Sequence, residues 1–245
     1  MPKFFLPDAN GRQVGDVVVI TGSDAHHISK TLRMKKGERL TLTSSDSTDY
    51  QAVIENFSES DVFLRVESLS RNESEPPVFS RLFQALAKGD KMDVVIQKAV
   101  ELGVSEFYPV ASARCVVQAD EKKAQKKHER WQRIAEEAAK QCGRGIIPQV
   151  YPIISFKDAV LEMKKSELYF ICYEASLDKN PRALFSASSF ASLAFFIGPE
   201  GGISPEELEF AHSEGVRDVT LGKRILRTET ASSTVLSMLL YETEF

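Results

Sequence analysis

The 245-residue sequence has few of the side chains that build metal centres and disulfide frameworks. Its three cysteines, Cys115, Cys142 and Cys172, stand far apart and form no C-x-x-C pair. Of its four histidines, His26 and His27 are adjacent and the other two are isolated. We therefore expect no metal site and no disulfide scaffold, which favours a reducing, cytoplasmic location.

Long apolar runs and a basic net charge are also missing. No hydrophobic run approaches the roughly 20 residues of a membrane helix, so we expect no membrane partner. The start, Met1 to Leu6, is followed at once by Pro7 and Asp8, unlike a secretory signal peptide. The net charge of −4 argues against a uniformly basic nucleic-acid-binding surface.

Positive charge is nevertheless concentrated in a few short segments, of which the first lies near the start of the chain and the others over residues 122–133 and 223–227. Between His26 and Arg39, five lysines and arginines stand against one acid, Glu38. Such a segment can hold a polyanion through salt-sensitive contacts, although a solvated helix face would look the same.

A change of composition between Ser70 and Pro77 predicts a linker, because the stretch is polar and ends in a Pro-Pro pair. Upstream, short β-rich segments alternate with turns, and one helix is expected over His26–Met34 with Asp24 as its cap. This pattern predicts a small barrel or sandwich over residues 1–72. The expected strands are Val17–Thr21, Arg39–Thr43, Gln51–Ile54 and Val62–Glu67.

Downstream, expected strands and helices alternate over residues 73–245. This order predicts an α/β domain with a mainly parallel sheet covered by helices on both faces. The last helix has a broad apolar face, which belongs either in the core or against a partner subunit. The expected strands are Leu82–Ala87, Phe107–Ala111, Leu168–Tyr173, Leu193–Ile197 and Asp218–Leu221. The expected helices are one from Lys88-Gly89-Asp90 to Gly103, then Ala119–Gln141, Phe156–Lys165, Pro205–Ser213 and Glu229–Tyr241.

The most informative stretch is the glycine-rich turn from Gly198 to Gly202 that follows a buried strand. A helix begins directly after it, with Ser204 as N-cap, Pro205 in the first position and Glu207 completing a capping box. Strand–loop–helix connections of this kind carry ligand sites at the carboxyl ends of parallel strands, although an ordinary turn has the same pattern. The spacing fits neither common phosphate loop, and Glu200 would repel a pyrophosphate. An adenine or a cationic ligand suits the loop better.

A second glycine turn, at Gly222, leads through a basic loop into the last helix. Arg227 stands at the helix N-terminus, where the helix dipole disfavours a cation, so an anionic partner is expected there. A carboxylate such as Glu229 is favourable at that position for structure alone.

These motifs resemble those of the bacterial 16S ribosomal RNA uridine-N3-methyltransferases, the RsmE family. The resemblance extends over nearly the whole chain and is carried by Gly198–Ser204, Leu221–Ala231, His26–Met34, Lys88–Met92, Gln97–Val104 and Glu137–Arg144. It implies a SPOUT-type α/β domain with a C-terminal trefoil knot, preceded by a PUA-like β-barrel. It also implies S-adenosylmethionine as cofactor, a homodimer, and 16S ribosomal RNA of the small ribosomal subunit as partner.

Carried onto this sequence, the resemblance implies three groups of site residues. The cofactor would contact Tyr173, Gly198, Glu200, Gly201, Gly202, Leu221, Gly222, Leu226 and Thr228. Catalysis would use Arg227, with Arg224 and Glu229 as further candidates, and the proton acceptor could be Glu200, Glu229 or water. RNA would contact Lys3, His27, Lys30, Arg33 and Lys36, with Lys3 standing where the family often has arginine. The alternatives are a ribose 2′-O-methyltransferase of the same fold and a non-enzymatic RNA-binding protein.

Overall fold

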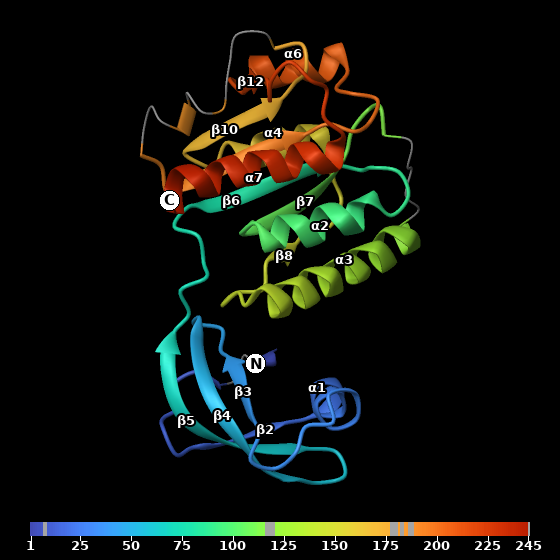
Figure 1. Cartoon of the computed structure of the whole chain (residues 1–245). Helices are drawn as coiled ribbons and strands as arrows, with labels where there is room; N and C mark the ends of the chain where they lie inside the picture. The colour runs from blue at the N-terminus through green and yellow to red at the C-terminus, as the bar shows by residue number, and fades with distance from the viewer. Residues whose placement is uncertain (7–8, 116–120, 177–180, 182–183, 186–188, 245) are drawn as a thin grey trace. The chain divides into compact units, whose positions relative to one another are not determined.

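The computed structural model describes residues 1–6, 9–115, 121–176, 181, 184–185 and 189–244 (Figure 1). The chain forms two compact units. The first contains Met1–Glu75 and Ala139–Ile147, and the second contains Pro76–Ala138 and Pro148–Phe245.

The first unit is built on a five-stranded sheet in the order β1-β3-β4-β5-β2. Strand β1 pairs in parallel with β3, and the other neighbours are antiparallel. The strands are β1 (Lys3–Phe5), β2 (Val17–Ile20), β3 (Arg39–Thr43), β4 (Thr48–Phe57) and β5 (Val62–Arg71).

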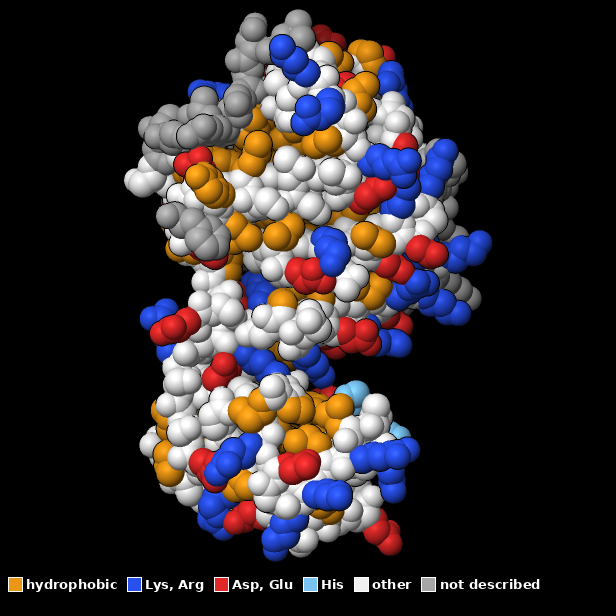
Figure 2. All heavy atoms as spheres, in the orientation of Figure 1, with side chains coloured by type: hydrophobic (Ala, Val, Ile, Leu, Met, Phe, Trp, Pro, Cys, Tyr) orange, Lys and Arg blue, Asp and Glu red, His pale blue; other side chains and the backbone are white. Residues whose placement is uncertain are grey.

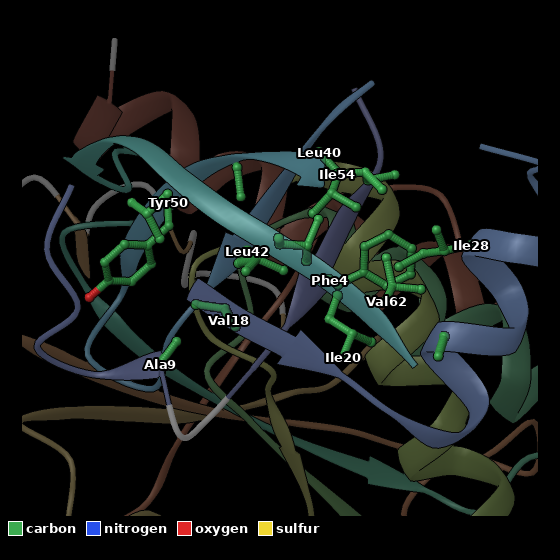
Figure 3. Packing of buried hydrophobic residues seen from close by; sticks show 14 residues of the cluster. Phe4, Ala9, Val18, Ile20, Ile28, Leu40, Leu42, Tyr50, Ile54 and Val62 are labelled. Atoms are coloured by element: carbon green, nitrogen blue, oxygen red, sulfur yellow. The ribbon is translucent and has the colours of Figure 1, made fainter. Parts of the chain in front are cut away.

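The sheet of the first unit curls around its own hydrophobic core (Figure 3). Alternate residues of β4, namely Tyr50, Ala52 and Ile54, point inward and are buried, as the two-residue period of a strand requires. Ile28 closes one end of the core from the helical segment. The predicted small β-rich domain is confirmed.

The helical segment differs from the expected continuous helix over His26–Met34. A short helix α1 (Gly22–His26) continues into a π-helical turn η2 (His27–Thr31), closed by the bond from Leu32 N to His27 O at 2.9 Å. The prediction that Asp24 caps the helix was wrong, because Thr21 stands at the N-cap position. Asp24 instead lies in the first turn and accepts a hydrogen bond from Lys140 Nζ at 3.1 Å.

The stretch predicted as a linker is largely bonded into the first unit. Strand β5 runs to Arg71, and Asn72 Nδ2 then donates to Asp49 at 2.8 Å and to the carbonyl of Gly143 at 3.1 Å. Glu75 accepts hydrogen bonds from Arg144, at 2.6 Å. The division into domains at residues 72 and 73 stays a prediction.

The second unit contains a seven-stranded sheet in the order β12-β10-β11-β6-β7-β8, with β9 paired to β7. Every pairing between its strands is parallel, which confirms the predicted parallel α/β sheet. The strands are β6 (Phe79–Ala85), β7 (Glu106–Ala111), β8 (Gln149–Val150), β9 (Ile154–Ser155), β10 (Leu168–Cys172), β11 (Ser192–Ile197) and β12 (Arg217–Val219).

Helices cover both faces of this sheet, as predicted (Figure 1). Helices α2 (Lys91–Glu101) and α7 (Thr228–Glu244) pack against one another on one face, and α7 also contacts β11. On the other face lie α4 (Phe156–Met163) and α6 (Pro205–Ser213), whose buried residues share a core cluster with Phe83, Phe196 and Ile171. Helix α3 (Glu121–Cys142) begins next to undescribed residues, so the predicted start at Ala119 lies outside the described part of the chain.

Two helix-end predictions meet different outcomes. The capping box of α6 is present, with Ser204 and Glu207 bonded reciprocally and a proline in the first position. Asp90 stands at the N-cap of α2, but its side chain makes no capping hydrogen bond.

In α7, Val235, Leu236 and Leu239 are buried by α2 and β11, which favours the core interpretation of its apolar face. None of the described helices combines the length and the apolar character needed to cross a membrane.

Candidate functional site

A pocket of about 390 Å³ lies in the second unit where β10 and β11 end and where the chain leaves β12. These strands are neighbours and run in parallel, so their carboxyl ends meet at one edge of the sheet. The pocket is lined by Lys91, Cys172, Tyr173, Glu174, Ile197, Gly198, Pro199, Glu200, Gly202, Ile203, Thr220, Leu221, Gly222, Arg224, Ile225, Leu226, Arg227, Thr228 and Ala231.

The first wall is the glycine loop that follows β11. It closes as a turn, with Gly202 N donating to Pro199 O at 2.9 Å. Gly202 has φ +72°, a left-handed conformation that favours glycine, and a Cβ there would lie 3.2 Å from Glu174 Oε1. The sequence therefore forms a sharp bend whose backbone stays open to the pocket.

The second wall is the loop from Thr220 to Arg227. Thr220 Oγ1 accepts a hydrogen bond from Gly222 N at 3.2 Å, which fixes the turn after β12. Beyond the turn, Arg224 and Arg227 are exposed, and neither has an ion-pair partner among the described residues. Ile225 lies between them with 85% of its surface exposed. The loop thus presents two free guanidinium groups at the pocket.

An ion-pair cluster joins the first loop to two helices. Lys91, the first residue of α2, places its ammonium 2.8 Å from Glu200 Oε1 and 3.8 Å from Glu229 Oε2. The hydrogen bond with Glu200 raises the pKa of Lys91. Burial is the largest single effect on Glu200 and opposes its ionisation, but the hydrogen bond from Lys91, the backbone N–H donors and the charge of Lys91 together hold the pKa of that carboxyl below its usual value. Glu200 is therefore a weak proton acceptor.

Comparison with known proteins bears on what this pocket holds. An RNA methyltransferase domain matches residues 74–240, and an RNA methyltransferase PUA domain matches residues 20–67. A ribosomal RNA small subunit methyltransferase E from Bacillus subtilis is 37% identical over 230 residues, which cover 92% of this chain and 90% of that protein. The chain belongs to the ribosomal RNA small subunit methyltransferase E family.

Solved structures agree with this assignment and extend it to the fold. The family member from Neisseria gonorrhoeae, solved with S-adenosyl methionine, has a TM-score of 0.86 and 32% identity over 98% of this chain and 97% of that one. A methyltransferase from Legionella pneumophila, solved with bound SAM, has a TM-score of 0.87 and 34% identity over 98% of this chain and 96% of that one. The resemblance inferred from the motifs and the predicted fold class are confirmed, whereas the trefoil knot stays a prediction.

Most residues that the family resemblance implies for the cofactor line this pocket. They are Tyr173, Gly198, Glu200, Gly202, Leu221, Gly222, Leu226 and Thr228. Gly201 is not among the lining residues; its carbonyl accepts a hydrogen bond from Arg114 Nη1 at 3.0 Å. Of the catalytic candidates, Arg224 and Arg227 line the pocket, but Glu229 does not and lies beside Lys91 instead.

Among the residues that sequence reasoning missed are Lys91 and Ile225, which line the pocket, and Gln84, which bonds to the lining residue Thr228. Lys91 follows the loop after β6, whose carboxyl end lies at the same sheet edge as that of β11. That placement was a usable signal for Lys91.

Among the described residues, no three His, Cys, Asp or Glu side chains are grouped as a metal site would need.

The RNA-binding candidates all lie in the first unit and fall into two classes. His27, Lys30, Arg33 and Lys36 are exposed on or just after the π-helical turn. Lys3 has a side chain only 8% exposed, which pairs with Asp49 at 3.1 Å and donates to Gly143 O at 2.8 Å. It is engaged inside the unit. On the face shown in Figure 2, lysines and arginines are interspersed with acids and form no continuous basic surface.

Proposed function

We propose that this protein transfers a methyl group from S-adenosylmethionine to N3 of a uridine in 16S ribosomal RNA. The observation that carries the proposal is the pocket at the carboxyl edge of the parallel sheet, bounded by both glycine loops. Support comes from relatives named for the small-subunit ribosomal RNA and from similar structures solved with the cofactor.

The pocket fits the cofactor in size and in lining. Its volume of about 390 Å³ lies in the range of small-molecule sites. Backbone groups dominate the glycine walls, and Leu221 and Leu226 add apolar surface for a planar ring. We assign the adenine to these two leucines, and the third wall to Tyr173 and Glu174. When bound, the sulfonium supplies an already activated methyl group.

The protein's own task is to position the uridine and favour loss of the proton at N3. A guanidinium beside the base stabilises the negative charge that spreads over N3 and the two carbonyl oxygens. Arg227 is our first choice for this role and Arg224 the second, because both line the pocket and are free of ion-pair partners among the described residues. Glu200 is hydrogen-bonded to Lys91 and Glu229 does not line the pocket, so we assign the proton to water.

We assign RNA binding to the exposed basic segment of the first unit. Lys30, Arg33 and Lys36 would contact phosphates, and His27 would lie beside them. Arg33 has φ +53°, a strained conformation for a residue with a side chain, which often marks a functional segment. The π-helical turn that precedes Arg33 also supports a functional role, because such turns are frequent at functional sites. Lys3 is not part of this surface.

The finer biological setting also belongs to the proposal. We place the enzyme in the cytoplasm as a homodimer acting on the small ribosomal subunit. The family resemblance supports this setting, and extrusion of the target base into the pocket is the expected mode of access.

The test uses small ribosomal subunits and free 16S ribosomal RNA that lack the modification. Each is incubated with the protein and isotope-labelled S-adenosylmethionine, and nucleosides are identified by mass spectrometry. Label in N3-methyluridine supports the proposal. Label in a 2′-O-methylated ribose would overturn the assigned target atom, and absence of both cofactor binding and label would leave a non-enzymatic RNA-binding protein.

Replacing Arg227 tests the assigned role of the guanidinium. Arg227→Ala should lower kcat by about 100-fold or more, the usual effect of removing one preorganised charge from a transition state. The cofactor Kd should stay within about threefold, because the proposed contact is with the uridine. Unaltered turnover would remove Arg227 from this role.

A further inference from the structure

A buried glutamine on the central strand β6 is hydrogen-bonded to the cofactor pocket without lining it. Gln84 is fully buried, and its amide Nε2 donates to Thr228 Oγ1 at 2.8 Å. Thr228 Oγ1 in turn donates to Gly198 O at 2.8 Å. A chain of two hydrogen bonds therefore joins β6, the start of α7 and the end of β11.

The polarity of this chain is fixed. A carbonyl only accepts, so the single hydroxyl proton of Thr228 is committed to Gly198. The hydroxyl oxygen then needs a donor on its other side, which the amide of Gln84 provides. A side chain without an N–H at position 84 would leave the hydroxyl oxygen of Thr228 without this donor and the side chain less firmly held.

A glutamine at position 84 destabilises the core compared with an apolar side chain. Its flanking residues on β6, Phe83 and Ala85, are fully buried. Its own Oε1 is buried and has no hydrogen-bond partner among the described residues. An unsatisfied buried acceptor costs roughly as much as a hydrogen bond contributes, so an apolar side chain would stabilise this strand better. The amide donates two hydrogen bonds, to Ala85 O at 3.1 Å and to Thr228 Oγ1 at 2.8 Å, and only the second connects it to the pocket.

Two members of this hydrogen-bonded series, Thr228 and Gly198, stand where the two pocket walls begin and end. Gly198 begins the first glycine loop, and Thr228 ends the second loop at the start of α7. Gln84 is beside Ile197, the residue before Gly198, in the register of β6 and β11, and it bonds directly to Thr228 of the second wall. Loss of a hydrogen bond in this series would alter the spacing between the two pocket walls.

We propose that Gln84 is a positioning residue for the methyl-transfer pocket, which acts through Thr228 to hold the two glycine loops at the spacing that S-adenosylmethionine requires. This inference rests on the proposed function, because it assumes that this cofactor occupies the pocket. Gln84 itself makes no contact with the cofactor.

The test compares Gln84→Met, which keeps the length of the side chain but has no N–H, with the whole wild-type chain. Calorimetry with S-adenosylmethionine and steady-state kinetics with the ribosomal substrate give Kd, KM and kcat. We expect Kd and KM for the cofactor to rise about tenfold, equivalent to the loss of one buried hydrogen bond. At saturating cofactor, kcat should change less than about threefold.

Further variants separate positioning from general stability. Thr228→Ala removes both hydrogen bonds and should weaken cofactor binding at least as much, whereas Thr228→Ser keeps the hydroxyl and should retain cofactor binding. Combining Gln84→Met with Thr228→Ala should add little, since both act on one chain. Ser232→Ala is the matched control, because its hydroxyl is buried in α7 and bonds only within that helix, at 3.2 Å to Glu229 O.

The outcomes distinguish this inference from the proposed function. If the wild-type protein binds the cofactor and Gln84→Met binds it equally well with a lower melting temperature, Gln84 is merely structural and the inference is wrong. If the wild-type protein does not bind the cofactor, the proposed function fails first. Should Gln84→Met not fold, Gln84→Leu removes the N–H with a smaller side chain and is judged by the same measurements of Kd and melting temperature.

Discussion

Replacing Gly202 by alanine separates the cost of a strained backbone from the cost of a narrowed pocket. Gly202 has φ +72°, and Gly215, in the turn after α6, has φ +81°. Forcing a residue with a Cβ into this region costs about 1–2 kcal/mol. Gly202→Ala and Gly215→Ala should therefore lower the free energy of unfolding by similar amounts, about 1 kcal/mol after allowing for the stiffer unfolded chain.

The two positions differ in what the new methyl group meets. At Gly202 it lies 3.2 Å from Glu174 Oε1 and 3.8 Å from Arg114 Nη1, whereas at Gly215 nothing lies within 4 Å. Because Gly202 and Glu174 both line the pocket, the displaced carboxylate and the methyl group narrow it. Overpacking costs about 1–3 kcal/mol, and 1.4 kcal/mol corresponds to about a tenfold rise in Kd.

The assay is chemical unfolding with and without S-adenosylmethionine. At 100 times its Kd, the cofactor should stabilise the wild-type protein by about 2.7 kcal/mol, and a tenfold weaker Kd would leave about 1.4 kcal/mol at the same concentration. Gly215→Ala should keep the full stabilisation despite its lower starting stability. The reasoning fails if S-adenosylmethionine stabilises Gly202→Ala as strongly as the wild-type protein, or if it no longer stabilises Gly215→Ala.

Two further predictions concern charge. Reversing both Lys30 and Arg33 to glutamate should weaken RNA binding and flatten its dependence on log salt by about 0.7 for each lost phosphate contact; an unchanged slope would place the RNA surface elsewhere. The pKa of Glu200 in the folded protein is held below the usual 4.5. The ionised Glu200 therefore adds to the free energy of unfolding above pH 4.5, and this contribution is lost as the pH falls through the lowered pKa. Between about pH 5 and pH 3, the melting temperature of Lys91→Met should therefore fall less steeply than that of the wild-type protein, while Lys98→Met, a control for an exposed pair on α2, should keep the wild-type slope.

Local signals in the sequence predicted the parts of the fold that depend on neighbours in the chain. The helix Pro205–Ser213 has the predicted bounds because its capping box and first proline act within one turn. The strand Arg39–Thr43 also has the predicted bounds, set by a turn and a β-rich run. Both glycine loops lie at the pocket because strand–loop–helix order places them at one edge of a parallel sheet.

Features that depend on distant partners were missed or misplaced. Strand β1 is only Lys3–Phe5, and it exists because it pairs in parallel with β3 about 40 residues later. Gln84 bonds to a residue 144 positions away, and within a buried run nothing local marks it as part of the site. Lys3 carries a charge that suggested RNA, yet Asp49 and the carbonyl of Gly143 satisfy it.

The arrangement of charge around the pocket follows from what the proposed reaction requires. Glu200 is hydrogen-bonded to Lys91, and Glu229 lies outside the pocket lining with its Oε2 3.8 Å from the same ammonium, so neither presents a free negative charge to a base that must become an anion. Glu174, the other acid of the lining, belongs to the third wall, which we assign to the cofactor. The two arginines of the second loop, in contrast, are exposed and without ion-pair partners among the described residues. Keeping an exposed guanidinium unpaired costs little, because water solvates it until the substrate arrives. When the uridine excludes that water, the same charge acts in a lower dielectric and stabilises the anion more strongly. This change of medium explains why the two unpaired arginines stand on the open loop, where the substrate can exclude water from them.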